Sequence, residues 1–132
     1  MKLDFTSLEK AVESLNRAIQ RSQNDLKDEE IRDAVIQRFE YTYELCWKMM
    51  KRQIEKESPS PESIDKLSFK DLLREAAEKQ IISNVEDWME YRESRNITAH
   101  TYNAQKAKIV YQSAVKFNVD AANLLKCLKS RP

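Results

Sequence analysis

The sequence predicts an all-α protein, and three features of the chain lead to that prediction. No glycine occurs among its 132 residues, whereas average usage would give roughly nine, so tight β-hairpin turns lack their preferred residue. Long amphipathic stretches with few β-branched runs fill most of the chain. The three prolines, Pro59, Pro61 and Pro132, lie outside the expected helix interiors. We expect an up-down four-helix bundle with one additional short helix, forming a single domain over residues 1–132.

The first two helices follow from apolar residues repeated at helical spacing. The first helix should begin at Thr6, because Glu9 three residues later completes a capping box, and the polar run 22–27 should end it. The second and longest helix is expected over about 28–57, and the segment 58–61 (Ser-Pro-Ser-Pro) should end it because proline lacks an amide donor. The two apolar stripes are, in order, Leu8, Val12, Leu15 and Ile19, then Ile31, Val35, Phe39, Tyr43, Cys46, Met50 and Ile54.

Three further segments complete the expected bundle. A short helix should be capped by Ser68, with Asp71 three residues later, and a fourth main helix by Ser83, with Glu86 three residues later. The final helix should start near Asn103. Their apolar residues are Leu72, Leu73 and Ala76 in the short helix, Val85, Trp88 and Met89 in the fourth, and the expected buried seam of the last, Val110, Ala114, Phe117, Ala121, Leu124 and Leu128.

Between the last two helices lies the segment Arg95–Tyr102, RNITAHTY, which we call the octet. It contains the only histidine of the chain, His100. An imidazole can both give and take a proton near neutral pH, and the planar arginine fork matches phosphate oxygens. A proton shuttle beside a phosphate-binding cation suits phosphodiester cleavage, so Arg95 and His100 are the candidate catalytic residues.

Helix geometry sets a condition on this candidate site. Residues five apart differ by about 140° around a helix, so Arg95 and His100 would diverge on an unbroken helix, whereas Arg92 and Arg95 would share a face. Either the helix ends near Ala99 or the two groups meet through a second chain. Cleavage by attack of the ribose 2′-hydroxyl needs a base, an acid and a cation. We therefore expect a homodimer, whose two-fold axis would bring together two copies of His100 and Arg95, with Asn96 orienting the phosphate or the imidazole.

The pattern R-x4-H-x-Y, formed by Arg95, His100 and Tyr102 with Asn96 after the arginine, resembles the HEPN domains encoded beside a minimal nucleotidyltransferase. That family is also labelled nucleotidyltransferase substrate-binding protein. The segment 38–48 (RFEYTYELCWK) is similar to the second helix of the family. Ile81-Ile82 followed by Trp88 is similar to the segment that precedes the R-x4-H-x-Y motif in that family. Relatives often carry a glycine after the second helix, where this chain has Ser58-Pro59, so the shape of that connection is expected to differ.

The resemblance implies a metal-independent ribonuclease, often a dimer and often a toxin. It implies as partner a minimal nucleotidyltransferase antitoxin that adds AMP to the hydroxyl of Tyr102, in a heterotetramer or larger complex. The added phosphates would neutralise the nearby arginines and fill the RNA groove. Apart from the resemblance, two small basic clusters, at 48–52 and at 106 and 108, are candidates for tracking an RNA backbone, but in a chain this charged such clusters are more often solvated surface.

Several other interpretations of the same residues stay open. In the main alternative, the chain is a non-enzymatic subunit that presents a nucleotide or other substrate to the nucleotidyltransferase. In a third interpretation, it is a purely structural helical adaptor. In the structural interpretation Arg95 pairs with a nearby glutamate, His100 caps the preceding helix and the ring of Tyr102 is half-buried. Glu40 and Glu44 are expected on a solvated face, with Glu44 paired to Lys48 four residues later.

Composition and motifs exclude several classes of function. Without glycine the chain has neither a Walker phosphate loop nor a dinucleotide fingerprint. One histidine and two separated cysteines, Cys46 and Cys127, disfavour a metal site, and no cofactor is expected. A net charge of +1 provides no global basic field for nucleic acid. The cysteines lack C-x-x-C spacing, and no signal peptide or membrane span is evident, so we expect reduced thiols in a cytoplasmic protein.

Overall fold

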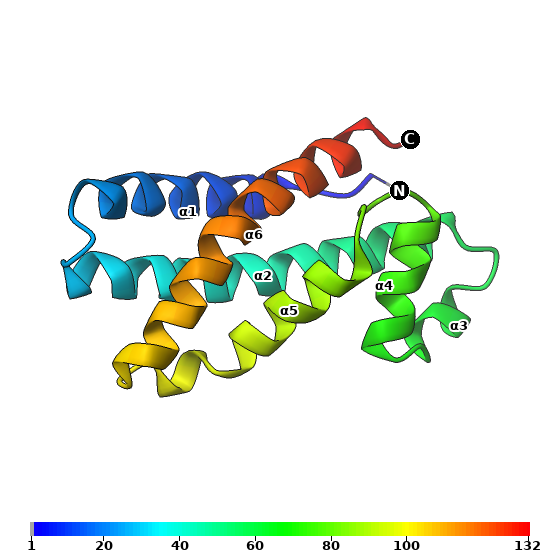
Figure 1. Cartoon of the computed structure of the whole chain (residues 1–132). Coiled ribbons are helices and arrows are strands. Elements are labelled where there is room, and N and C mark those ends of the chain that lie inside the picture. Colours follow the sequence, from blue (N-terminus) through cyan, green and yellow to red (C-terminus); the bar gives the residue numbers. More distant parts are fainter. Residues whose placement is uncertain (1) are drawn as a thin grey trace.

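The computed structural model describes residues 2–132, and over that range the chain is built from helices without a β-strand, as predicted (Figure 1). Six α-helices and one short 3-10 helix follow one another along the chain. They are α1 (Thr6–Asn24), α2 (Glu29–Glu57), α3 (Pro61–Asp65), α4 (Phe69–Glu78), α5 (Val85–Asn96), η1 (Thr98–His100) and α6 (Ala104–Ser130).

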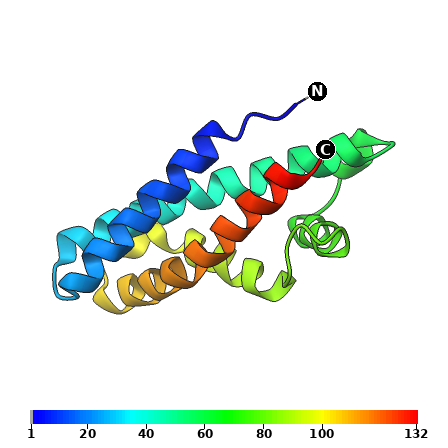
Figure 2. The same ribbon diagram turned by 90° about the horizontal axis from the view of Figure 1, so that it is seen from above.

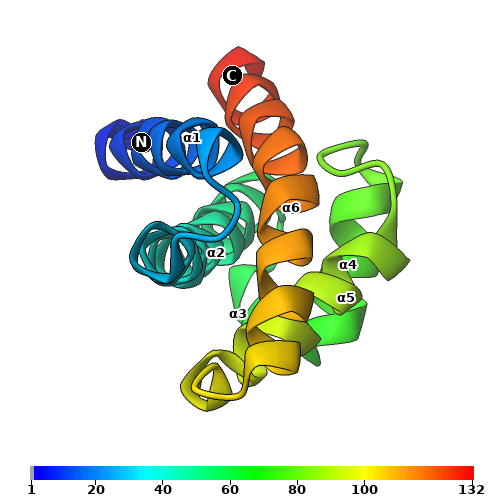
Figure 3. The same ribbon diagram turned by 60° about the vertical axis from the view of Figure 1, so that its left-hand side comes forward.

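The four long helices, α1, α2, α5 and α6, alternate in direction and form the predicted up-down bundle (Figures 1 and 2). Helix α2 is central, because it packs against α1, α6 and α5 and also contacts α3 and α4. The end-on view in Figure 3 places α1 and α4 on opposite sides of α6. The octet forms the connection from α5 to α6 at one end of the bundle, in the yellow part of Figure 1.

A group of buried aromatic rings fixes α5 against α2 and α6. Phe39 on α2 and Tyr91 on α5 each meet the ring of Phe117 on α6 edge-on, with centroids 5.2 Å apart in both pairs. Trp88 on α5 packs on Phe117 at 5.6 Å. Such pairs contribute about 0.5–1.5 kcal/mol each beyond the burial of area. The start of the octet is therefore held by a rigid part of the core.

Local hydrogen bonds decide where the helices begin, and two of the predicted caps are wrong. The Thr6 capping box does not form, because Thr6 is already inside α1 and its N–H donates to Asp4 Oδ1 at 2.9 Å. Helix α5 is capped by Asn84 rather than Ser83, since Asn84 Oδ1 accepts from the N–H of Asp87 at 3.1 Å. The cap of α4 by Ser68 is confirmed, as are starts beside Asp28 for α2 and Asn103 for α6.

The segment after α2 contains a helix that was not predicted from the sequence. Pro61 occupies the first turn of this helix, α3, where its missing amide donor has no helical partner to lose. Ile64 is buried and anchors this single turn, which packs on α2. Ile31, expected in the buried stripe of α2, is only half-buried.

Helix α4 ends in a turn that normally uses glycine. Gln80 has φ of 62°, the N–H of Ile81 donates to the carbonyl of Ala76 at 2.8 Å, and the N–H of Gln80 donates to the carbonyl of Ala77 at 3.0 Å. These two bonds define a Schellman motif, whose left-handed residue is usually glycine. A glutamine therefore takes a strained backbone conformation in a glycine-free chain.

Candidate functional site

The chain bends sharply inside the octet. Helix α5 ends at Asn96 and η1 follows over Thr98–His100, so the helix break predicted near Ala99 falls between Arg95 and His100. The N–H of His100 donates to the carbonyl of Ile97 at 2.9 Å, and the side chain of Asn103 then caps α6. The octet is thus an ordered turn, and the catalytic candidates are not on one continuous helix.

Two acidic side chains of α2 hold the beginning of the octet. Arg95 Nε donates to Glu44 Oε1 at 3.0 Å, and Arg95 Nη2 lies 3.9 Å from Glu40 Oε1. The hydroxyl of Thr98 lies 2.8 Å from Glu40 Oε2. No local pattern connects these residues, which are separated by 51 and 58 positions. Arg95 therefore does pair with a glutamate, as the structural interpretation expected.

The prediction that Glu44 pairs with Lys48 on a solvated face is wrong. Glu44 Oε2 instead accepts a hydrogen bond from Trp47 Nε1 at 3.1 Å, while Oε1 binds Arg95. The ammonium group of Lys48 lies over the ring of Trp47, 5.9 Å from its centroid. Both carboxylate oxygens of Glu44 are thus occupied, and the residue belongs to the site.

His100 and Tyr102 lie together on the outer side of the turn. Their ring centroids are 6.3 Å apart with an interplanar angle of 74°, an edge-to-face arrangement. Tyr102 is 87% exposed, so the half-buried ring of the structural interpretation is not found, and His100 is exposed as well. A phenol and an imidazole are therefore both open to a large partner molecule.

One chain does not pair the imidazole with the guanidinium. Within residues 2–132, no hydrogen bond joins the side chain of His100 or Asn96 to Arg95. Asn96, the last residue of α5, is exposed. The structure brings Arg95 to the acids of α2 and His100 to Tyr102, and it does not join the imidazole to the guanidinium within one chain.

A cavity of about 370 Å³ opens beside Arg95, between α2, α4 and α5. Arg92 and Arg95 both line it, which confirms that these residues share one face. No local pattern in the sequence indicates the aromatic part of its wall, formed by Trp47 and Phe69. The three-residue spacing of the two arginines is the one local signal of this cavity. The full lining is Tyr43, Glu44, Trp47, Lys51, Ile64, Leu67, Phe69, Leu72, Arg92, Arg95 and Asn96.

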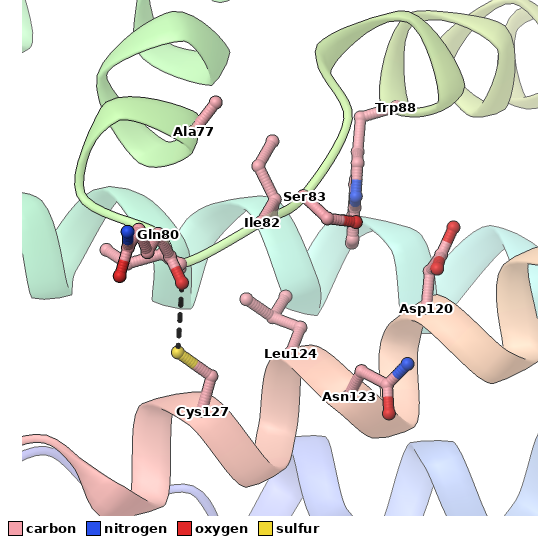
Figure 4. Close-up of a pocket in the computed structure, with 10 residues that line it drawn as sticks. Ala77, Gln80, Ile82, Ser83, Trp88, Asp120, Asn123, Leu124 and Cys127 are labelled. Atoms are coloured by element: carbon pink, nitrogen blue, oxygen red, sulfur yellow. Dashed lines mark hydrogen bonds between the residues drawn. The ribbon is translucent and has the colours of Figure 1, made fainter.

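A second cavity, of about 430 Å³, lies away from the octet, between the end of α4, the start of α5 and the C-terminal half of α6 (Figure 4). Two of its polar side chains, those of Asp120 and Cys127, are already engaged within the protein. Cys127 Sγ donates to the carbonyl of Gln80 at 3.7 Å, and Asp120 accepts from the hydroxyl of Tyr91. No octet residue lines it, so the Arg95 end of the bundle is the better candidate site.

The described residues also bear on metals and membranes. Across residues 2–132, no three His, Cys, Asp or Glu side chains are grouped so that they could hold a metal ion. Neither does any helix in that range combine the length and the apolar character needed to cross a membrane. Cys46 on α2 and Cys127 on α6 are both free thiols.

Comparison with known proteins shows the family to which the chain belongs. Residues 3–130, which include the octet and the α2 acids, match the family described as "Nucleotidyltransferase substrate binding protein like". The chain is 36% identical to "Probable ribonuclease HepT" of Haemophilus influenzae over 98% of its own length and 94% of that protein.

The chain belongs to the HepT-like nucleotidyltransferase substrate-binding family.

Solved structures share the helical fold of this chain. The chain superposes on HI0074 from Haemophilus influenzae with a TM-score of 0.91 and 33% identity, covering 96% of this chain and all of the other. That structure was described as revealing the fold of a substrate-binding domain of a nucleotidyltransferase. A Thermus thermophilus protein, ttk003001694, matches with a TM-score of 0.75 and 28% identity over 92% and 98% of the two chains. This HepT-like chain therefore shares its helical bundle with both solved structures.

Proposed function

We propose that this protein is a metal-independent endoribonuclease and the cytoplasmic toxin of a toxin–antitoxin pair. The observation that carries the proposal is the exposed turn of the octet, which presents His100 and Tyr102 to solvent a few residues after Arg95, whose guanidinium is bound to Glu44 of α2. The similarity to a probable ribonuclease supports the same reaction class. The substrate would be RNA, because only RNA carries the 2′-hydroxyl that this mechanism uses.

The proposed reaction needs two copies of the chain. His100 of one protomer would remove the proton of the 2′-hydroxyl as its oxygen attacks the adjacent phosphorus. His100 of the second protomer would protonate the leaving 5′-oxygen, giving a 2′,3′-cyclic phosphate and a free 5′-hydroxyl. Arg95 would neutralise the charge that develops on the phosphoryl oxygens, and Asn96 would orient the phosphate or the imidazole. This scheme requires a homodimer, because one chain has one histidine.

The proposed regulation is adenylylation of Tyr102 by a minimal nucleotidyltransferase. The phenol oxygen would attack the α-phosphorus of ATP, losing its proton while pyrophosphate leaves. The exposure of Tyr102 gives a transferase access to the hydroxyl, and its ring lies 6.3 Å from that of His100. Each added AMP would place a negative charge where RNA must bind, and so switch the toxin off. Toxin and antitoxin would form a heterotetramer or a larger assembly.

One observation favours a second function. Arg95 is already paired with Glu44, and a cavity adjoins this pair. Such a site suits a subunit that presents a nucleotide or other substrate to the nucleotidyltransferase without cleaving RNA. HI0074, whose structure was described as that of a substrate-binding domain of a nucleotidyltransferase, supports this second function. This non-enzymatic function predicts binding without turnover.

Cleavage assays separate the two functions. Purified wild-type protein should cut single-stranded RNA without added metal and should leave the 2′-deoxy strand of the same sequence intact. Arg95→Ala and His100→Ala should each reduce cutting at least a hundredfold, whereas Arg74→Ala, an exposed arginine paired with Asp71, should cut normally. Equal cutting of DNA, or full activity in His100→Ala, would disprove the ribonuclease proposal. Intact mass after co-expression with the transferase should show added AMP on the wild type and none on Tyr102→Phe.

A further inference from the structure

The cavity beside Arg95 has a wall suited to a flat ring. Trp47 and Phe69 meet edge-to-face, with centroids 6.0 Å apart at 83°, and Ile64, Leu67 and Leu72 add apolar surface. A volume of about 370 Å³ is at the lower end of the roughly 300–1,000 Å³ found for small-molecule sites. The shape and lining fit one planar aromatic ligand with a small polar extension.

The same cavity carries an uncommitted positive charge. The guanidinium carbon of Arg92 lies 4.4 Å from the centroid of Phe69, and within residues 2–132 no carboxylate comes within ion-pair distance of Arg92. Lys51, by contrast, is paired with Asp65 at 2.6 Å, and Arg95 with Glu44. Among the described residues, Glu44 is the single acid in a lining that holds three cations. The cavity therefore favours an anionic ligand whose charge meets Arg92.

The lining also contains a hydroxyl without a partner. Tyr43 is 2% exposed, and its hydroxyl oxygen is buried and makes no hydrogen bond within the described residues. Burial raises the pKa of this phenol, and the charges of Arg92, Glu44 and Arg95 also act on it. The hydroxyl thus lies near the charged lining, stays protonated, and can both donate and accept.

We infer that this cavity binds a nucleobase, with the attached phosphate on Arg92. Aromatic rings and arginine planes provide stacking surfaces for bases, a phenol hydroxyl suits the mixed donors and acceptors of a base edge, and the free guanidinium suits a phosphate. The inference rests on the proposed function in one respect: in the ribonuclease, the bound base belongs to the nucleotide next to the phosphate held by Arg95. The cavity would then determine the base preference of cleavage.

Mononucleotide titration tests the cavity without any cleavage. Trp47 fluorescence should change on titration with AMP, GMP, CMP or UMP up to millimolar concentration, with one base favoured, and Trp47→Phe should lose the signal because Trp88 lies outside this cavity. Tyr43→Phe should weaken binding roughly three- to tenfold and Arg92→Gln roughly tenfold. Arg74→Gln, an exposed arginine outside the lining, is the matched control. Wild-type protein that binds no mononucleotide, or variants that bind as the wild type does, would overturn the inference.

Cleavage mapping tests whether the base comes from the RNA strand. On a random-sequence RNA pool, the wild type should prefer one base beside the cut bond, and Tyr43→Phe should flatten that preference at least threefold. An unchanged preference in Tyr43→Phe would contradict the inference even if RNA is cut. Mononucleotide binding by a wild type that cuts no RNA would instead disprove the ribonuclease and leave the nucleobase site standing. The two proposals can therefore fail separately.

Discussion

Arg95 Nε donates to Glu44 Oε1 across 3.0 Å, joining the last turn of α5 to the middle of α2. The two side chains are 31% and 32% exposed, so solvent weakens the pair without separating it. The acid orients the guanidinium that the proposed reaction uses, and it also competes with any phosphate for the same donors. Glu44 should therefore limit the affinity of the site for RNA.

Glu44→Gln should bind RNA more tightly. Removing the competing charge while keeping an amide oxygen for Trp47 should lower the Kd roughly three- to tenfold at low salt, and the gain should shrink as salt rises. Anisotropy with labelled RNA measures this, on a His100→Ala background so that the strand stays intact. Glu93→Gln, an exposed acid on α5, controls for net charge. Equal or weaker binding by Glu44→Gln than by Glu93→Gln would contradict the competition.

Thr98→Val should loosen η1. The hydroxyl of Thr98 lies 2.8 Å from Glu40 Oε2 and 2.9 Å from the carbonyl of Arg95, and its loss should lower the free energy of unfolding by about 1–2 kcal/mol. RNA cleavage should fall as well, because His100 is in the same turn. Thr101→Val, whose hydroxyl reaches only the carbonyl of Thr98, should affect cleavage less. Urea denaturation and a rate assay measure the two effects.

Loss of the hydroxyl should change the stability of the fold differently at two buried tyrosines, Tyr91 and Tyr43. Tyr91 donates to the carboxylate of Asp120, so Tyr91→Phe leaves that acid without its partner and should destabilise the fold by about 1–3 kcal/mol. The Tyr43 hydroxyl has no partner within the described residues, so Tyr43→Phe should be neutral or slightly stabilising. Denaturant midpoints compare the two variants directly. A large loss of stability in Tyr43→Phe would mean that its hydroxyl is satisfied in solution.

Gln80→Gly should stabilise the protein. The residue holds φ of 62° in the Schellman turn after α4, and glycine adopts that conformation without the steric penalty of a side chain. The expected gain is about 0.5–1 kcal/mol, since the greater freedom of glycine in the unfolded chain offsets part of it. Lys79→Gly, one position earlier with φ of −82°, should destabilise instead. Thermal melts of both variants are the measurement.

Acid should weaken the ion pair between Glu57, the last residue of α2, and Arg131, which follows the end of α6. Hydrogen bonds from the guanidinium of Arg131 and from the side-chain amide of Gln53 lower the pKa of Glu57 from the ordinary 4.5 to about 2. A depressed carboxyl pKa stabilises the fold fully above pH 4.5, and this contribution is lost as pH falls toward 2. The difference in unfolding free energy between wild type and Glu57→Gln should therefore shrink over that range. Glu62→Gln, an exposed acid on α3, should leave the wild-type pH profile unchanged.

Local signals predicted most of the fold. The long apolar seams of α2 and α6 and the caps at Ser68 and Asn103 are determined by neighbouring residues, so local patterns were sufficient for them. Ser83 and Asn84 are adjacent and both able to cap, and only the structure decides which oxygen reaches an amide. Helix α3 depends on the packing of Ile64 against α2, which no local pattern records.

The site was harder to predict because its contacts are distant in sequence. The break between Arg95 and His100 was expected from polar residues in the turn, and the shared face of Arg92 and Arg95 from helical spacing. Glu44 was assigned to a local pair with Lys48 instead, since an i,i+4 spacing is visible in sequence and a separation of 51 residues is not. The catalytic roles of Arg95, His100 and Asn96 and the modification of Tyr102 stay predictions.

The first turns of α1 and the last turns of α6 lie side by side, joined by a 2.7 Å ion pair between Glu9 and Lys129, at the end of the bundle remote from the octet (Figures 1 and 2). A tether, reporter domain or sensor surface coupled at either terminus would thus project away from the turn that carries His100. Immobilised protein should keep that turn free for RNA or an antitoxin, which makes the chain well suited to surface-based capture of its binding partners.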